Sequence, residues 1–329
     1  MEGRERIKFS FGEPVGRKYL FDREAELDAL DHCESCFLTG PLGAGKTSLA
    51  KSHIEKTGCS AVWIRGEKIS GSRSLVSAII REVLKAKERS EHKDEYKAVE
   101  IEIENYRDGK IDVYTFITRL FESVERMEIC FIFDEYPELR RIGPLFNHLN
   151  RVIFASTKRR SLRIILTSSE LGYTKFLLER KDLPLGLYVK EVKVLPFREE
   201  KSIEFIALGM EKYGHECPKK SYSRIYPVTE GFPLWLSLVG QRMLEGKCNV
   251  DGIYDDERAQ AFWIKRLISL SEKERLMLRY IAQGRKFTEI GPHSRRVLTS
   301  LYMKGYVSSM KEIKIVDPVL NALLQLSKI

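Results

Sequence analysis

The stretch FLTGPLGAGKTSLAK, residues 37–51, decides how the first half of the chain is organised. Three glycines fall within six residues of it, and a lysine and a threonine follow directly. An apolar run precedes the glycines, and a pattern typical of a helix follows them. Backbone amides can converge on an anion where no Cβ atom intervenes, and a helix start directs its positive end to the same point. The stretch therefore predicts a phosphate-binding loop.

The loop matches the pattern G-x-x-x-x-G-K-[ST] at every fixed position. The Lys46 ammonium is expected to reach the β and γ phosphates of a nucleotide, and the Thr47 hydroxyl to bind Mg²⁺. Chance would give this pattern in about one chain in a hundred of this length. An ordinary loop is the alternative, and the predicted strand and helix on either side argue against it. The residues predicted to bind the nucleotide here are Gly40, Pro41, Gly43, Ala44, Gly45, Lys46, Thr47 and Ser48.

Two acids follow the apolar run ICFIF, residues 129–133. Asp134 stands at the tip of this predicted strand, and Glu135 follows it directly. A phosphate loop needs a carboxylate from a neighbouring strand to hold Mg²⁺ through water, which is the role expected of Asp134. Glu135 can polarise a water molecule for attack on the γ-phosphate. The alternative is that the two acids only begin a loop.

Hydroxyl side chains end the next predicted strand, at Thr167, Ser168 and Ser169. One of them could sense the γ-phosphate or the attacking water, and Ser169 is taken as the catalytic candidate. Serine and threonine also end many strands without such a role. Arg180, near the end of the following helix, is a candidate to act on the nucleotide of a neighbouring subunit, although most arginines at such helix ends are solvated.

Helix and strand patterns alternate over the first 196 residues. The predicted strands lie at residues 36–39, 61–65, 129–133, 162–167 and 188–195. The predicted helices cover residues 23–33, 47–56, 74–87, 113–126, 145–156 and 174–181. Mostly apolar strands separated by helices indicate a parallel sheet buried on both faces. Residues 1–196 are therefore predicted to form an α/β P-loop NTPase domain, from which the charged stretch 87–110 would project as an exposed helix or a mobile insertion.

The pattern changes character after Pro196. Residues 197–256 are predicted to form a helical lid subdomain that residues 217–233 interrupt, with an acidic linker at its end. Residues 257–329 are predicted to form a winged-helix domain. Its helices are expected at residues 272–282, within 287–303 and at 318–326, and a two-stranded ribbon is expected at 307–317.

The C-terminal module is basic. From Ser271 onward the chain has eleven basic and five acidic residues, a net charge of +6 within a total of +9. Such asymmetry favours a polyanionic partner, here duplex DNA bound by the third helix of the winged-helix domain. An equally weighted alternative is that the module binds protein or packs against the ATPase domain. The candidate DNA contacts are Arg295, Arg296, Lys304, Lys311 and Lys314.

Composition sets broad limits. No apolar run reaches the roughly 18 residues that a membrane span needs, and the N-terminus MEGRERIKFS lacks the apolar core of a signal peptide. A cytoplasmic protein without membrane partners is therefore expected. Cys33 and Cys36 form a CxxC without a second pair, so zinc or redox chemistry is a minor alternative to simple packing. Cys130, inside an apolar run, is expected in the core.

Several motifs together resemble one family, the archaeal ATPases of the signal-transduction (STAND) group, which are relatives of AAA+ proteins within the ASCE class. FDREAEL (21–27) looks like the box that lines the adenine side of the site in that family. The stretches GPLGAGKTSL, FIFDEYPEL and ILTSSELG look like its phosphate loop, magnesium strand and following serine motif. EGFPLWL (230–236) resembles the Gly-x-Pro element of its lid.

The resemblance covers nearly the whole chain and implies an ATPase that uses ATP and Mg²⁺. It places Phe21, Arg23 and Glu24 near the nucleotide, and Pro233 near the base or ribose. The chain departs from the family where Gly186 is followed by Leu187, because the family often has Gly-Arg there. An arginine trigger at that position is therefore in doubt. The chain lacks a guanine-reading Asn/Thr-Lys-x-Asp motif, which favours adenine.

Three hypotheses follow. The first is an ATP-dependent molecular switch that hydrolyses ATP to ADP and phosphate between the α/β domain and the lid. The second is a DNA-binding replication or partition factor, similar in domain order to origin-recognition proteins, in which nucleotide only gates DNA affinity. The third is a regulatory scaffold that scarcely hydrolyses its nucleotide. A protein client and self-association stay open as further partners.

Overall fold

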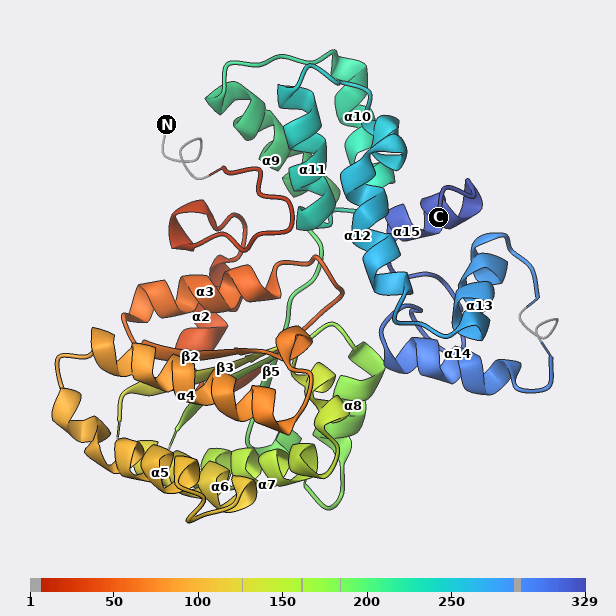
Figure 1. Cartoon of the computed structure of the whole chain (residues 1–329). Helices are drawn as coiled ribbons and strands as arrows, with labels where there is room; N and C mark the ends of the chain where they lie inside the picture. The colour runs from red at the N-terminus through yellow and green to blue at the C-terminus, as the bar shows by residue number, and fades with distance from the viewer. Residues whose placement is uncertain (1–6, 126, 161, 184, 287–290) are drawn as a thin grey trace.

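The apolar runs of the first half form one parallel sheet (Figure 1). The structure, a computed structural model, describes residues 7–125, 127–160, 162–183, 185–286 and 291–329. The strands run in the order β2-β3-β4-β1-β5, and each neighbouring pair is parallel. Their bounds are β1 Ser35–Thr39, β2 Ser60–Arg65, β3 Ile129–Asp134, β4 Arg163–Ser168 and β5 Lys190–Lys193. The prediction of an α/β P-loop fold with a buried parallel sheet is confirmed.

One detail of the sheet corrects the sequence interpretation. The phosphate loop follows β1 and the acidic pair ends β3, so the two strands were expected to be neighbours. The structure places β4 between them. Strand order is set by how the crossover helices pack rather than by the local motifs, so the sequence pattern carried no information about this insertion.

Helices cover both faces of the sheet (Figure 1). Along β1 the side chains alternate, so that Cys36 and Leu38 pack in one hydrophobic cluster and Phe37 in another. The first face is covered by α2 (Glu24–Asp31) and α3 (Lys46–Thr57). The other face is covered by α4 (Ser72–Arg89), α6 (Val113–Val124) and α7 (Pro144–Arg159). The helix α8 (Leu171–Glu179) follows β4.

The charged stretch 87–110 is not a free excursion. Its second half contains α5 (Lys97–Arg107), whose Val99 and Ile103 are buried. The Tyr106 ring lies 4.8 Å from the Phe116 ring of α6, measured between centroids. The helix therefore exposes its charged face and packs its apolar face, as amphipathic helices do. The predicted helix 113–126 ends at Val124 among the described residues, and its last residue, Arg126, lies outside them.

The helical lid contains α9 (Glu199–Lys212), α10 (Lys219–Thr229) and α11 (Pro233–Leu244). The stretch 217–233, expected to interrupt the helices, instead forms α10, with Pro227 inside its last turn. A proline there removes one backbone bond close to the helix end, where the helix stops two residues later. The cysteines pair as Cys33–Cys36 and Cys217–Cys248, and Cys130 is buried as expected.

The C-terminal module begins with a helix that sequence reasoning missed, α12 (Glu257–Leu267). Its signal was present, because Asp256 caps it and Ala259, Trp263 and Leu267 are buried at a spacing of four residues. The following helices are α13 (Glu272–Ala282), α14 (Ser294–Met303) and α15 (Pro318–Gln325).

The winged-helix assignment stays a prediction. Residues 287–290, where its second helix was expected to begin, lie outside the described residues. The expected ribbon is present as a single antiparallel bridge between Val307 and Ile315. One hydrophobic cluster runs from the N-terminal Ile7 through the lid into this module. The boundaries proposed at residues 196 and 256 reflect changes in the sequence pattern. In the structure, the lid and the C-terminal module on either side of residue 256 share one hydrophobic core.

The junction between the lid and α12 is held by charge. Asp256 accepts hydrogen bonds from Arg242 of α11, at 2.9 Å, and from Arg258, and it caps the start of α12 through the Arg258 amide. Hydrogen bonds from Arg258 and Arg242 hold the pKa of Asp256 well below its usual range, although burial opposes this effect. The carboxylate therefore stabilises the folded state in its ionised form.

Asp256→Asn should lower the free energy of unfolding by about 1–3 kcal/mol at neutral pH, because it removes a buried charge partner of two arginines. The folded-state pKa of Asp256 is depressed, so its contribution is complete above the ordinary aspartate pKa and is lost as the pH falls. The difference between the two proteins in urea denaturation should therefore stay constant down to about pH 4 and shrink progressively as the pH falls further.

The matched control is Glu257→Gln, which removes an exposed carboxylate one residue further along α12. It should change the free energy of unfolding by no more than about 0.5 kcal/mol. An equal effect of the two substitutions would show that the ion pairs of Asp256 do not stabilise the junction.

Candidate active site

The loop between β1 and α3 takes the shape that its glycines permit. Gly43 and Gly45 have φ angles of 82° and 100°, in the region that a side chain disfavours. Gly45 is also the residue before α3, so the helix begins at Lys46. The Arg23 guanidinium braces the loop by donating a hydrogen bond to the Ala44 carbonyl oxygen at 3.1 Å. The backbone amides at the start of α3 therefore face the cavity described below, with the positive end of the helix behind them.

Lys46 is buried and has no carboxylate within hydrogen-bond distance among the described residues. Its ammonium donates to the carbonyl oxygens of Gly40 and Pro41, at 2.9 and 3.0 Å. The Glu135 carboxylate oxygen Oε1 lies 3.8 Å away. Burial lowers the pKa of Lys46, and the charges of Glu135 and Asp134 offset this only in part. An anion in the loop would restore the favourable environment that the buried cation lacks.

The Asp134 carboxylate, at the end of β3, lies next to hydroxyl groups from α3 and β4. The Thr47 hydroxyl lies 3.0 Å from its Oδ1, and the Thr167 hydroxyl of β4 donates to the same oxygen at 2.7 Å. Burial raises the pKa of Asp134, and the neighbouring Glu135 raises it further. Thr167 therefore spans the gap that the insertion of β4 opens between β1 and β3.

This donor set fits Mg²⁺. A hydroxyl and a carboxylate are the hard oxygen ligands that the ion prefers, and Thr47 and Asp134 would hold it. The described residues contain no group of three His, Cys, Asp or Glu side chains able to bind a metal. Phosphate oxygens and water would complete the coordination of an ion held by Thr47 and Asp134. Bound there, the ion would neutralise charge on the phosphates.

Glu135 has a strained backbone and a fixed carboxylate. Its φ angle is 51°, a left-handed conformation that is uncommon outside glycine and that occurs often at functional sites. Its amide donates to the Thr167 hydroxyl at 2.9 Å, and the Ser169 amide donates to its Oε2 at 2.9 Å. The structure thus gives Ser169 a backbone contact with Glu135, whereas the hydroxyl at the metal carboxylate is that of Thr167. The prediction that Ser169 senses the γ-phosphate or the attacking water stays a prediction.

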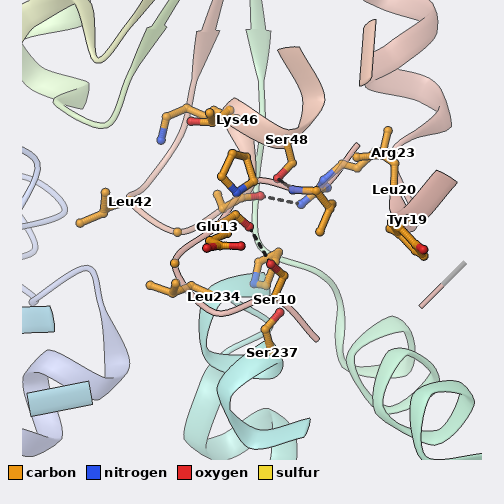
Figure 2. A pocket seen from close by; sticks show the side chains of 18 of the residues that line it. Ser10, Glu13, Tyr19, Leu20, Arg23, Leu42, Lys46, Ser48, Leu234 and Ser237 are labelled. Carbon is orange, nitrogen blue, oxygen red and sulfur yellow. Dashed lines mark hydrogen bonds between the residues drawn. The ribbon is translucent and has the colours of Figure 1, made fainter. Parts of the chain in front are cut away.

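A cavity of about 280 Å³ opens above the loop (Figure 2). Lys46, Thr47, Ser48, Asp134 and Glu135 line one end of it. Phe21, Arg23 and Pro233, which the resemblance placed at the nucleotide, also line it. Glu24 is exposed and is not among the lining residues, and its placement near the nucleotide stays a prediction. Arg23 donates to Ala44 and stacks over Phe197, and its guanidinium therefore supports the wall rather than lying free in the cavity.

Other lining residues were missed. The N-terminal segment contributes Ser10 and residues 12–15, and α11 contributes Leu234 and Ser237, which face the loop in Figure 2. The tip of β2 contributes Arg65. Finally, α12 contributes Phe262 and Arg266. These residues belong to no local motif and reach the cavity only through tertiary packing, so a single sequence gave no signal for them.

The remaining candidates lie away from this cavity. Arg180 pairs with Asp182 and is not among the lining residues. Arg295 and Arg296 are exposed on the first turn of α14. Lys304 forms an ion pair with Glu274, at 2.7 Å, and Lys314 pairs with Glu312, while Lys311 is exposed. None of these residues lines the nucleotide cavity, but Lys304 lines a neighbouring cavity together with Pro41 and Glu135.

Comparison with known proteins agrees with this geometry. The sequence model of one family, described as an ATPase domain predominantly from Archaea, matches residues 20–239. The chain belongs to this family. The match covers the phosphate loop, the acidic pair and most of the lid, and the protein is accordingly a P-loop ATPase. A search of the curated proteins gave no match. No helix formed by the described residues is long and apolar enough to cross a bilayer.

Solved structures share the fold over nearly the whole chain. A Walker-type ATPase of Pyrococcus abyssi is 21% identical, with a TM-score of 0.74, and the match covers 96% of this chain and 99% of that one. The ORC2 protein of Aeropyrum pernix, in its ADPNP–ADP complexes, is 13% identical with a TM-score of 0.60, covering 97% and 98%. The Cdc6p of Pyrobaculum aerophilum is 14% identical with a TM-score of 0.50, covering 97% of each chain. At these identities the likeness shows the fold alone.

Gly66→Ala should slow ATP hydrolysis by about ten- to a hundredfold, because small displacements of a catalytic group have effects of this size. A Cβ atom at Gly66 would lie 2.3 Å from the Glu135 carbonyl oxygen, so Glu135 would have to move. Phosphate release at saturating Mg-ATP measures the effect. The control is Gly71→Ala, where an added Cβ meets no atom within 4 Å. Wild-type turnover in Gly66→Ala would show that the position of Glu135 does not limit the rate.

Proposed function

We propose that the protein is a Mg-ATP-dependent molecular switch in which hydrolysis at the β1–α3 loop changes how the lid and the C-terminal module lie on the ATPase domain. The observation that supports this most is the composition of the cavity wall. Side chains from the α/β domain, from α11 of the lid and from α12 of the C-terminal module all line it. A ligand in the cavity would therefore touch every part that has to move.

Each residue of the site has a role in hydrolysis. The backbone amides of residues 43–47 and the Lys46 ammonium would bind the β and γ phosphates. Thr47 and Asp134 would hold Mg²⁺. Glu135, with one carboxylate oxygen fixed by the Ser169 amide and the other 3.8 Å from Lys46, would orient the attacking water and accept its proton. Thr167 would keep Asp134 and Glu135 in register through its two hydrogen bonds.

The presence of a fixed carboxylate at Glu135 favours a hydrolysing switch over a scaffold that only binds nucleotide. ATP rather than GTP is favoured because the chain has no guanine-reading motif. The aromatic rings of Phe21 and Phe262 line the cavity and offer apolar surface to a base.

Glu135→Gln should abolish phosphate release while leaving Mg-ATP binding intact. Mg-ATP at 100 times its dissociation constant should stabilise wild type and Glu135→Gln alike by about 2.7 kcal/mol, seen as a higher melting temperature. Lys46→Ala is the contrasting variant and should lose both the thermal shift and the turnover. Wild-type turnover in Glu135→Gln would exclude Glu135 as the base, and an unchanged thermal shift in Lys46→Ala would remove Lys46 from the site.

A second candidate function, ATP-gated binding of duplex DNA, is supported by the surface of α14. Arg295 and Arg296 are exposed and form no ion pair with any residue in the described part of the chain. They stand at the start of the helix that would enter the major groove of DNA if the winged-helix prediction holds. By contrast, Lys304 and Lys314 already have acidic partners, so they are weaker candidates than the sequence suggested.

Replacing Arg295 and Arg296 together by glutamate should weaken duplex binding and make it less dependent on salt, because fewer phosphate contacts release fewer counterions. Fluorescence anisotropy with a labelled duplex at several salt concentrations measures this. The matched control replaces Lys219 and Lys220, an exposed basic pair at the start of α10, by glutamate. An equal loss of duplex affinity in the control would show that the effect comes from the change in net charge and not from contacts of Arg295 and Arg296. No duplex affinity in wild type at low salt would favour the switch alone.

A further inference from the structure

Arg266 of α12 occupies a position that neither the sequence motifs nor the family match accounts for. Of the described residues in 257–329, Phe262 and Arg266 line the nucleotide cavity, and Arg266 is the charged one. Arg266 also lines a second cavity, of about 550 Å³, between the ATPase domain and the C-terminal module. Four residues line both cavities: Leu42, Glu67, Glu135 and Arg266. Arg266 therefore lies at the same boundary as Glu135, the residue that faces the attacking water.

The Arg266 guanidinium is poorly satisfied where it lies. It donates one hydrogen bond to the Phe262 carbonyl oxygen, at 3.2 Å, and stacks over the Phe262 ring with its central carbon 3.7 Å from the centroid. A guanidinium has five donor hydrogens, so most of its hydrogen-bonding capacity is unused. Within the described part of the chain no carboxylate comes within 4 Å of it. Arg258, at the other end of the same helix, and Arg242 of α11 both have such a partner in Asp256.

Burial destabilises the charge of Arg266. Burial lowers its pKa, and the charges of Glu67, Tyr306 and Glu135 offset that effect only in part. A half-buried cation without an ion pair is costly unless a ligand supplies the missing charge. A triphosphate is such a ligand, since its three phosphate groups carry more negative charge than Mg²⁺ and Lys46 neutralise together. Arginine is also well suited to bidentate contact with phosphate oxygens.

We propose that Arg266 binds the terminal phosphate of the bound nucleoside triphosphate and so reports to α12 whether that phosphate is present. This inference rests on the proposed nucleotide site and names the residue that couples it to the C-terminal module. The terminal phosphate is specified because Arg266 and Glu135 both line the two cavities, and because Glu135, in the proposed function, would face the phosphate under attack. Arg266 is a binding residue and takes no part in moving the proton.

A phosphate contact at Arg266 would affect other parts of the protein because α12 packs against both the lid and the rest of the C-terminal module. The helix is tied to the lid through Asp256 and Arg242 at its start. Near its end Trp263 packs against Tyr306 of the C-terminal module, with ring centroids 6.2 Å apart. A phosphate contact at Arg266 would therefore hold the lid and the module together over the site, and hydrolysis would return Arg266 to its unpaired state.

The test compares two nucleotides on one variant. Calorimetry on the full chain should show Arg266→Ala binding a non-hydrolysable Mg-ATP analogue at least tenfold more weakly than wild type, about 1.4 kcal/mol. Its affinity for Mg-ADP should stay within about twofold of wild type. Arg266→Lys should recover part of the loss, because it keeps the charge but not the planar fork. A general folding defect would weaken both ligands equally, so it cannot imitate this result.

Two control variants sharpen the comparison. Lys265→Ala removes an exposed cation from the next position of α12, a residue that lines the second cavity only, and it should bind both nucleotides as wild type does. Arg65→Ala removes the exposed arginine at the tip of β2, which lines the nucleotide cavity from the ATPase domain. A loss specific to the triphosphate in Arg65→Ala but not in Arg266→Ala would overturn the assignment.

Other outcomes also decide against the inference. Equal weakening of both nucleotides in Arg266→Ala would overturn it, as would unchanged affinity for the triphosphate analogue. Both results leave the proposed function intact provided that Lys46→Ala abolishes binding. If wild type binds neither nucleotide, the proposed function fails and the inference fails with it.

Discussion

The geometry of the candidate active site centres on the hydroxyl of Thr167. The strand that precedes the phosphate loop and the strand that carries the acids are not neighbours, because β4 runs between them. Thr167, near the end of β4, donates to Asp134 and accepts from the Glu135 amide. Asp134 in turn lies 3.0 Å from the Thr47 hydroxyl. One side chain thus fixes the distance between loop and acids and also holds Glu135 in its left-handed conformation.

Several charged groups near Thr167 are destabilised by burial. Lys46 and Arg266 are cations whose pKa values burial lowers, and Asp134 is an acid whose pKa burial raises. Folding alone gains nothing from such groups, since each would be better satisfied in water. Their convergence on one cavity is expected when the partners that complete them are a polyanion and a divalent cation. The Asp256 carboxylate is different, because its two arginines complete it within the fold.

The sequence predicted what is local and missed what is tertiary. The phosphate loop, the acidic pair and the strand–helix alternation each lie within a short stretch, so their patterns were readable. The insertion of β4, the contacts of Thr167 with Asp134 and Glu135, and the position of Arg266 in the cavity wall depend on how distant segments pack, which no pattern in one chain encodes. Two errors were local: α12 had a visible cap and apolar period, and the stretch 217–233 was wrongly taken to interrupt the helices, although it contains α10.

The last turn of α14 rests on the start of α8. A Cβ atom at Gly172 would lie 2.9 Å from the Met303 backbone and from the Tyr302 ring, so the two helices meet where only a hydrogen atom fits. While that seam is closed, a macromolecule can approach the first turn of α14 but not the whole helix. A polyanion that lies along α14 from end to end must first separate α14 from α8. Its affinity would therefore be lowered by the free energy needed to separate these two helices.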